Sequence, residues 1–102
     1  MTPEGKVKAK VKATLDKLGV YYFMPTTGGY GRSGIPDIIG CIGGKYVALE
    51  VKRSLAEAKG NTGRICLQKK FIADIKKVGG YASLIYPENE QEILEELWVL
   101  GM

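Results

Sequence analysis

The sequence contains no histidine, and this absence removes several kinds of active site at once. It excludes serine and cysteine nucleophiles that depend on a histidine base, and zinc sites built on histidine pairs. The only two cysteines, Cys41 and Cys66, are spaced for neither a disulfide framework nor a four-ligand zinc site. Catalytic chemistry in this chain must therefore come from carboxylates, lysines or a bound metal ion.

Long apolar runs are also missing. No stretch approaches the roughly 20 apolar residues that a membrane span requires. The N-terminal residues, MTPEGKVKAKVK, lack the apolar region of a secretory signal. We therefore expect a cytoplasmic protein with no membrane association. A length of 102 residues suits one domain, residues 1–102, whose single modest core would gain stability from a partner.

Acidic side chains are scarce outside the C-terminal segment. Five of the 11 acids lie between residues 88 and 96, which leaves 15 basic and six acidic side chains before them and a net charge of +9 there. This asymmetry is typical of a basic face that binds a polyanion and an acidic face turned elsewhere. Two solvated helices of opposite charge would produce the same pattern, and charge alone does not decide between these interpretations.

Hydrophobic periodicity predicts three helices and four strands. The first helix is capped by Thr2 and stops at Gly19, the second runs from Arg64 to the glycines at 79 and 80, and the third follows Pro87. Strands are expected over residues 20–24, on both sides of Gly43-Gly44 and over 81–86, with an exposed connection over 53–63. This order predicts an α/β fold with a mixed sheet, because the hairpin is antiparallel and the second helix permits a parallel crossover.

Apolar spacing also predicts which helix faces are buried. The second helix carries a stripe of Leu67, Phe71, Ile75 and Val78, and the third carries Ile93, Leu94, Leu97 and Trp98. We interpret Trp98 and the aromatic residues Tyr21, Tyr22, Phe23 and Phe71 as core or interface positions rather than platforms for bases. The short apolar strands and the C-terminal stripe are candidates for a dimer face.

Three charged residues interrupt the apolar hairpin GIPDIIGCIGGKYVALEVK. If Gly43 and Gly44 form the turn, Asp37 lies opposite Glu50, and strand alternation places Lys52 on the same face. Two opposed carboxylates destabilise a sheet unless a cation lies between them. An ion-paired surface cluster is one explanation. The nearly continuous apolar flanks favour a second, because strands covered on both faces rarely carry charges without a function.

Two carboxylates beside an ammonium group suit Mg²⁺, which commonly binds one or two carboxylates and keeps coordination positions for water and phosphate oxygens. Such a metal ion can activate water and stabilise the charge that develops on phosphorus, while Lys52 can hold the water or the phosphate. The hairpin therefore predicts a phosphodiester hydrolysis site that needs no histidine.

The sequence resembles the PD-(D/E)xK nucleases, whose restriction-endonuclease-like core has the order αβββαβ. Pro36-Asp37 and Glu50-Val51-Lys52 match their signature. Gly34-Ile35-Pro36-Asp37, Glu50-Val51-Lys52-Arg53 and Gln68 are similar to the VRR-NUC branch, in stand-alone form often encoded by phages, and the resemblance extends from residue 4 to about residue 86. It implies that Asp37, Glu50 and the Val51 carbonyl bind Mg²⁺, with Mn²⁺ as a substitute. It further implies that Lys52 is the catalytic lysine, that Gln68 supports the site, and that Glu4 is a candidate ligand from the first helix.

A glycine-rich motif and three further basic residues complete the set of candidate binding features. GYGRSG, residues 29–34, satisfies G-x-G-x-x-G, but Ile35-Pro36 and a strand follow where a nucleotide-binding helix should begin, so no nucleotide cofactor is expected. Arg32 and Ser33 in this loop are candidate phosphate contacts, although turn chemistry explains the loop equally well. Arg53, Arg64 and Lys69 are the other candidate DNA contacts.

These observations predict a small Mg²⁺-dependent DNA endonuclease, acting as a homodimer in the cytoplasm of a bacterium or a phage-infected host. The resemblance to stand-alone VRR-NUC proteins implies activity on branched DNA such as Holliday junctions. The alternatives are a nicking or restriction-type nuclease on duplex or flap DNA, a non-catalytic DNA-binding module, and a metal-stabilised interaction protein.

Overall fold

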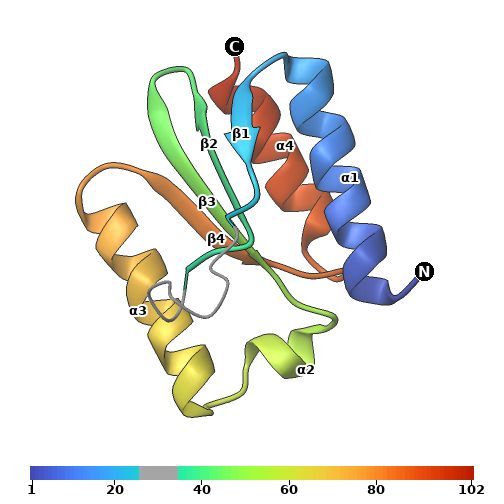
Figure 1. Ribbon diagram of the computed structural model, residues 1–102, viewed down its shortest axis with the longest axis vertical. Helices are drawn as coiled ribbons and strands as arrows, with labels where there is room; N and C mark the ends of the chain where they lie inside the picture. Colours follow the sequence, from blue (N-terminus) through green and yellow to red (C-terminus); the bar gives the residue numbers. More distant parts are fainter. Residues whose placement is uncertain (26–34) are drawn as a thin grey trace.

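The computed structural model describes residues 1–25 and 35–102. Along the chain, these residues form eight helices and strands (Figure 1). The elements are α1 (Pro3–Leu18), β1 (Tyr21–Phe23), β2 (Ile38–Ile42), β3 (Lys45–Val51), α2 (Leu55–Ala58), α3 (Gly63–Lys77), β4 (Tyr81–Ile85) and α4 (Glu90–Leu100). The predicted α/β class and order of elements are confirmed, and the connection after β3 contains the short helix α2.

The four strands form one mixed sheet in the order β1-β2-β3-β4. β1 and β3 are antiparallel to β2, while β3 and β4 are parallel and joined through α3. This topology confirms the predicted mixed sheet and is compatible with an αβββαβ core followed by a C-terminal helix. The hairpin register is also the predicted one, from Ile42 opposite Lys45 to Ile38 opposite Leu49.

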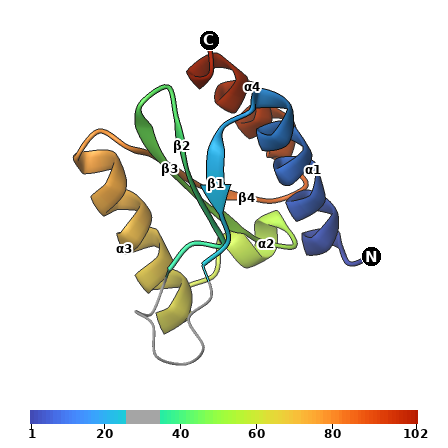
Figure 2. The ribbon, with the colours of Figure 1, turned by 45° about the horizontal axis from the view of Figure 1, so that its top comes forward.

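Helices cover the two faces of the sheet unequally. Figures 1 and 2 show α1 and α4 side by side on one face and α3 on the other. The larger core lies beneath α1 and α4 and contains Val7, Val11, Leu15, Ile38, Ile42, Val47, Leu49, Val51, Ile85, Ile93 and Leu97. A smaller cluster of Ala48, Ile72 and Ala82 lies beneath α3. The α3 face therefore keeps only a thin apolar layer, and the polar residues of the hairpin lie on this face.

Local sequence explains where the elements begin and turn. The Thr2 hydroxyl caps α1 by accepting a hydrogen bond from the Gly5 N–H at 3.0 Å, and Gly19 ends the helix with φ of 67°. Gly43 and Gly44 have φ of 57° and 84°, the positive values that a tight two-residue hairpin turn requires at both positions. The turn thereby fixes the register that places the charged residues.

The predicted buried stripe of α3 is wrong in part, because Phe71 and Ile75 are half-buried but the other two residues are not. Leu67 and Val78 are exposed, and the helix instead buries Ile65, Gln68 and Ile72. The physical reason is that α3 is oriented by Gln68, which hydrogen-bonds to β3, and by Ile72, which packs on the alanines of the sheet.

Of the aromatic residues predicted at core or interface positions, Tyr21, Phe23 and Trp98 are exposed and do not lie in the core, whereas Tyr22 and Phe71 are half-buried. β1 is an edge strand whose alternate side chains do not face α1, and α4 directs Ile93 and Leu97 rather than Trp98 into the core. In the described part of the chain, no helix has the length and apolar character needed to cross a membrane.

Candidate active site

Asp37 lies immediately before β2 and is held by the end of β3. Its Oδ2 accepts a hydrogen bond of 2.8 Å from the Val51 backbone N–H. Because β2 begins at Ile38, Asp37 lies one position beyond the regular ladder rather than within it. The bond from Val51 nevertheless fixes its carboxylate beside β3, where Glu50 is the preceding residue.

Glu50 is 4% exposed and only partly satisfied. Its Oε1 accepts a hydrogen bond of 3.0 Å from Nε2 of Gln68, which is itself 2% exposed. Among the residues that the structure describes, Oε2 of Glu50 and Oε1 of Gln68 are buried and have no hydrogen-bond partner. Buried polar atoms are normally paired, so two neighbouring bare oxygens indicate a place for a cation or a donor.

Lys52 lies two residues after Glu50, on the same face of the sheet. Its Nζ lies 3.8 Å from Oε1 of Glu50, and the residue is 7% exposed. The Lys52 N–H donates to the Ile85 carbonyl at 2.8 Å, which continues the parallel pairing past the end of β3. This backbone bond holds the lysine on the face shared with Glu50.

Burial raises the pKa of Glu50 to about 8, and the neighbouring charge of Asp37 and the hydrogen bond that the protonated Glu50 carboxyl makes with Asp37 act in the same direction. The positive charges of Lys52 and Arg64 oppose this rise without cancelling the effect of burial. In the metal-free protein, the Glu50 carboxyl is therefore largely protonated near pH 7. Its Oε2 lacks a hydrogen-bond partner among the described residues only in the ionised form, which is the form that binds a cation.

A hollow of about 240 Å³ opens at this cluster. Its lining residues are Glu4, Asp37, Glu50, Lys52, Glu57, Thr62, Arg64 and Ile65. The hollow thus brings together residues from α1, the hairpin, α2 and the start of α3. Glu4 and Arg64, which were predicted from distant segments, line the same space as the two acids.

The sequence interpretation missed Lys8 and Glu57. Lys8 Nζ lies 4.0 Å from Glu4 and 3.9 Å from Asp37, so one ammonium group serves both carboxylates. Its spacing of four residues from Glu4 on one helix was the available signal. Glu57 accepts from the Arg53 N–H at 3.1 Å and pairs with its guanidinium at 3.2 Å, a contact that depends on α2.

The remaining predicted residues lie at varying distances from the hollow. Arg53 is exposed and pairs with Glu57, which lines the hollow. Lys69 is not among the lining residues, and its ammonium group donates to the Gly60 carbonyl at 3.4 Å. Arg32 and Ser33, with the rest of the 29–34 motif, lie outside the described residues.

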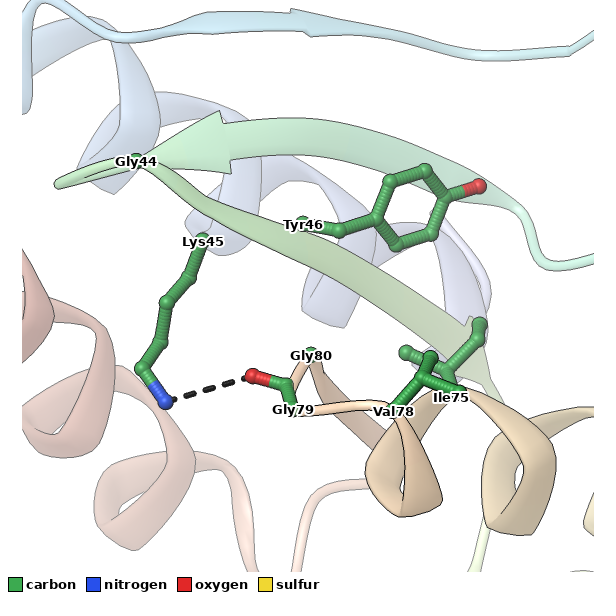
Figure 3. A pocket seen from close by; sticks show the side chains of 7 residues that line it. All are labelled: Gly44, Lys45, Tyr46, Ile75, Val78, Gly79 and Gly80. Atoms are coloured by element: carbon green, nitrogen blue, oxygen red, sulfur yellow. Dashed lines mark hydrogen bonds between the residues drawn. The ribbon is translucent and has the colours of Figure 1, made fainter.

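A larger hollow of about 520 Å³ lies elsewhere, where the hairpin turn meets the end of α3 (Figure 3). Its lining includes Tyr46, Ile75 and Val78, and the Lys45 ammonium donates to the Gly79 carbonyl at 3.3 Å. No acid lines it, so it lacks the paired groups that hydrolytic chemistry requires. The smaller hollow is the better candidate despite its size.

The donor set of the smaller hollow fits Mg²⁺. Among residues 1–25 and 35–102, no three acidic or cysteine side chains are grouped closely enough to hold a metal ion by themselves. Mg²⁺ does not need such a group, because one or two carboxylates with water and substrate oxygens complete its shell. The unpaired Oε2 of Glu50 and the adjacent Asp37 carboxylate supply such hard oxygen ligands.

Comparison with protein-family models, curated proteins and solved structures found no match to this chain. The functional assignment therefore depends on the residues and geometry of the site.

Proposed function

We propose that this chain is a Mg²⁺-dependent DNA endonuclease of the VRR-NUC type. The observation that carries the proposal is the buried Glu50 carboxyl, which has an unpaired oxygen beside Asp37 and a lysine 3.8 Å away. An ion-paired surface cluster would leave these groups exposed and neutralised, whereas Glu50 is buried and has a raised pKa. Asp37, Glu50 and the Val51 carbonyl would hold the metal ion, with Glu4 lining the same hollow as a further candidate ligand.

Bound Mg²⁺ would supply Lewis-acid stabilisation and lower the pKa of a coordinated water. Gln68 holds Glu50 in place through the 3.0 Å hydrogen bond, and Val51 holds Asp37. Lys52 presents an ammonium group that can hold the scissile phosphate or the attacking water. Arg64, on the rim, attracts the phosphate backbone into a site that is otherwise acidic.

The substrate that we propose is branched DNA such as a four-way junction, and the active form a homodimer in the cytoplasm. Every basic side chain precedes the acidic C-terminal segment, which supports polyanion binding on part of the surface. Light scattering at several protein concentrations tests the dimer.

The decisive experiment is a cleavage assay on labelled four-way junction, flap and duplex DNA, with Mg²⁺ or EDTA. The proposal predicts Mg²⁺-dependent cleavage that prefers the junction and is lost in Asp37→Asn. Lys52→Met should reduce cleavage by at least about 100-fold, because it removes a group that stabilises developing charge, while junction binding changes little. Equal cleavage of all three DNAs would favour the duplex or flap nuclease. Salt-sensitive binding with no cleavage would favour a non-catalytic module.

A further inference from the structure

Two aromatic side chains stand exposed on the edge strand β1. Tyr21 is 71% exposed and Phe23 is 45% exposed. Their ring centroids lie 6.1 Å apart with a tilt of 53°. Large exposed rings on a short edge strand are unfavourable in water unless they have a partner, so this pair requires a functional explanation.

The sheet register shows which face carries the two rings. Phe23 lies opposite Ile39, and Ile39 lies opposite Ala48. Directly opposed residues share a face, and Ala48 packs with Ile72 of α3. Tyr21 and Phe23 therefore lie on the α3 face, as does Glu50, which is two residues from Ala48 and bonded to Gln68 of α3. Figures 1 and 2 show α3 on the side of the sheet formed by β3 and β4, away from β1. The two rings on β1 are accordingly exposed.

Phe23 lies close to the two acidic residues on this face of the sheet. Phe23, Ile39 and Ala48 lie opposite one another across three strands. Ile39 is two residues after Asp37 and Ala48 is two residues before Glu50, a separation of about 7 Å along each strand. A base held on Phe23 therefore lies within reach of a phosphodiester at the carboxylates. The two rings and the two acidic residues therefore lie on the same face of the sheet.

A third ring lies on the same face, farther from the two acidic residues. Tyr46, which is 45% exposed, shares a row with Tyr21 through Cys41. Two strand spacings separate Tyr21 from Tyr46, about 10 Å. Figure 3 shows the Tyr46 side chain at the hollow beside Ile75 and Val78.

The charges around the rings favour a nucleic acid over a second copy of the chain. The helix on the same face as the rings, α3, carries five basic side chains and one acidic one, whereas α4 on the opposite face carries four acidic side chains and no basic one. A three-residue edge also offers little backbone pairing to another strand. Rings on an open sheet face beside basic groups are a known arrangement for stacking unpaired bases.

We infer that Tyr21 and Phe23 stack unpaired bases of the DNA strand whose phosphate enters the Asp37–Glu50 site. The inference rests on the proposed function and narrows its substrate class to DNA with unpaired nucleotides next to the cleaved bond. Fully paired duplex, whose bases already stack on one another, gains nothing from the rings. Tyr46 provides a further stacking position for a longer unpaired strand.

The test is binding without cleavage, in EDTA, of a single-stranded oligonucleotide carrying 2-aminopurine and of a fully paired duplex. Single-strand affinity should fall about tenfold in Tyr21→Ala and in Phe23→Ala, with loss of the 2-aminopurine quenching that stacking causes. Duplex affinity should change by less than about twofold, because phosphate contacts are unaltered. Phe23→Tyr should restore both affinity and quenching. Val99→Ala, which truncates an exposed apolar side chain of α4, should match the wild type.

Unchanged single-strand affinity in both alanine variants, or equal losses on single-stranded and duplex DNA, would overturn the inference. Conversion of a dimer into a monomer by Tyr21→Ala, with DNA binding intact, would also overturn it and assign the rings to a second copy. Thermal melting confirms that each variant is folded. The two proposals can fail separately. If 2-aminopurine is quenched but no Mg²⁺-dependent cleavage is seen, the proposed nuclease activity is refuted and base stacking on the rings is not. If DNA is cleaved but the ring substitutions do not change single-strand binding, base stacking is refuted and the nuclease activity is not.

Discussion

Replacing Glu50 by glutamine should stabilise the metal-free protein. In the folded state, the pKa of Glu50 is raised to about 8 from an ordinary value of 4.5. Between these two values, the unfolded chain releases the proton while the folded chain retains it, so ionisation favours unfolding and stability falls as pH rises. Glutamine has nearly the same shape and no charge. The substitution removes this destabilisation while retaining an acceptor for the Gln68 amide.

The magnitude follows from the pKa difference. Each unit of pKa is worth about 1.4 kcal/mol, so the penalty is close to zero at pH 4 and reaches roughly 3 kcal/mol at pH 7. Above pH 8 it stays constant, because both states are then ionised. The glutamine amide can also donate to the bare Oε1 of Gln68. A shift of 3 kcal/mol corresponds to a rise in Tm of very roughly 12–24 °C for a domain of this size.

The assay is urea unfolding of wild type and Glu50→Gln in EDTA at several pH values, repeated with saturating Mg²⁺. In EDTA, the variant should gain stability over the wild type as pH rises from 5 to 8. Mg²⁺ should stabilise the wild type, whose ionised carboxylate it binds, and leave the variant nearly unchanged. The matched control is Glu57→Gln, a neighbour in the same hollow whose carboxylate is only partly buried and pairs with Arg53. If Glu50→Gln is less stable than the wild type at pH 8 in EDTA, the electrostatic account of the site is refuted.

Two further predictions concern the support of the site. Gln68→Leu removes the hydrogen-bond donor to Glu50. Isothermal titration should show that Mg²⁺ affinity falls by about tenfold, the lower end of the effect of outer-sphere partners on metal sites. Gln91→Leu on α4 is the control, and equal Mg²⁺ affinities in the wild type and both variants would contradict the positioning role of Gln68. Gly43→Ala should lose roughly 1–3 kcal/mol in urea unfolding, because its φ is 57° and an added Cβ would lie 2.6 Å from the Leu100 carbonyl oxygen. Gly63→Ala, where the added Cβ meets nothing within 4 Å, should be near neutral, and equal losses in the two variants would show that the turn geometry is not responsible.

The hairpin and its charges were predictable because they depend on local rules. A glycine pair fixes a two-residue turn, the turn fixes the register, and the register places Glu50 and Lys52 on one face. The burial of Gln68 was not predictable from periodicity, since an amide interrupts an apolar stripe and its partner is 18 residues away in the chain. The same is true of Lys8, whose contact with Asp37 depends on how α1 crosses the sheet.

The exposure of the aromatic residues of β1 could not be predicted from their type alone. The letters YYF predict a strand, yet strand alternation assigns only Tyr22 to the face covered by α1. The phenol of Tyr22 donates to Asp16 at 2.6 Å, while Tyr21 and Phe23 lie on the opposite face. Whether that face was covered depended on the width of the sheet and the position of α3, neither of which the residues of β1 encode.

The fold stores an electrostatic cost at the site and offsets it on the opposite face of the same strands. Ile38, Leu49 and Val51 are almost fully buried beneath α1 and α4, and each side chain contributes roughly 2 kcal/mol by its burial. Together they exceed the roughly 3 kcal/mol by which the raised pKa of Glu50 lowers stability near pH 7. The apolar face can therefore hold the Glu50 carboxyl beside Asp37 before a cation arrives, and a metal ion that displaces the Glu50 proton removes this destabilisation. A cluster stabilised mainly by its own ion pairs would gain little from metal, so the dependence of stability on Mg²⁺ separates a functional site from a structural one.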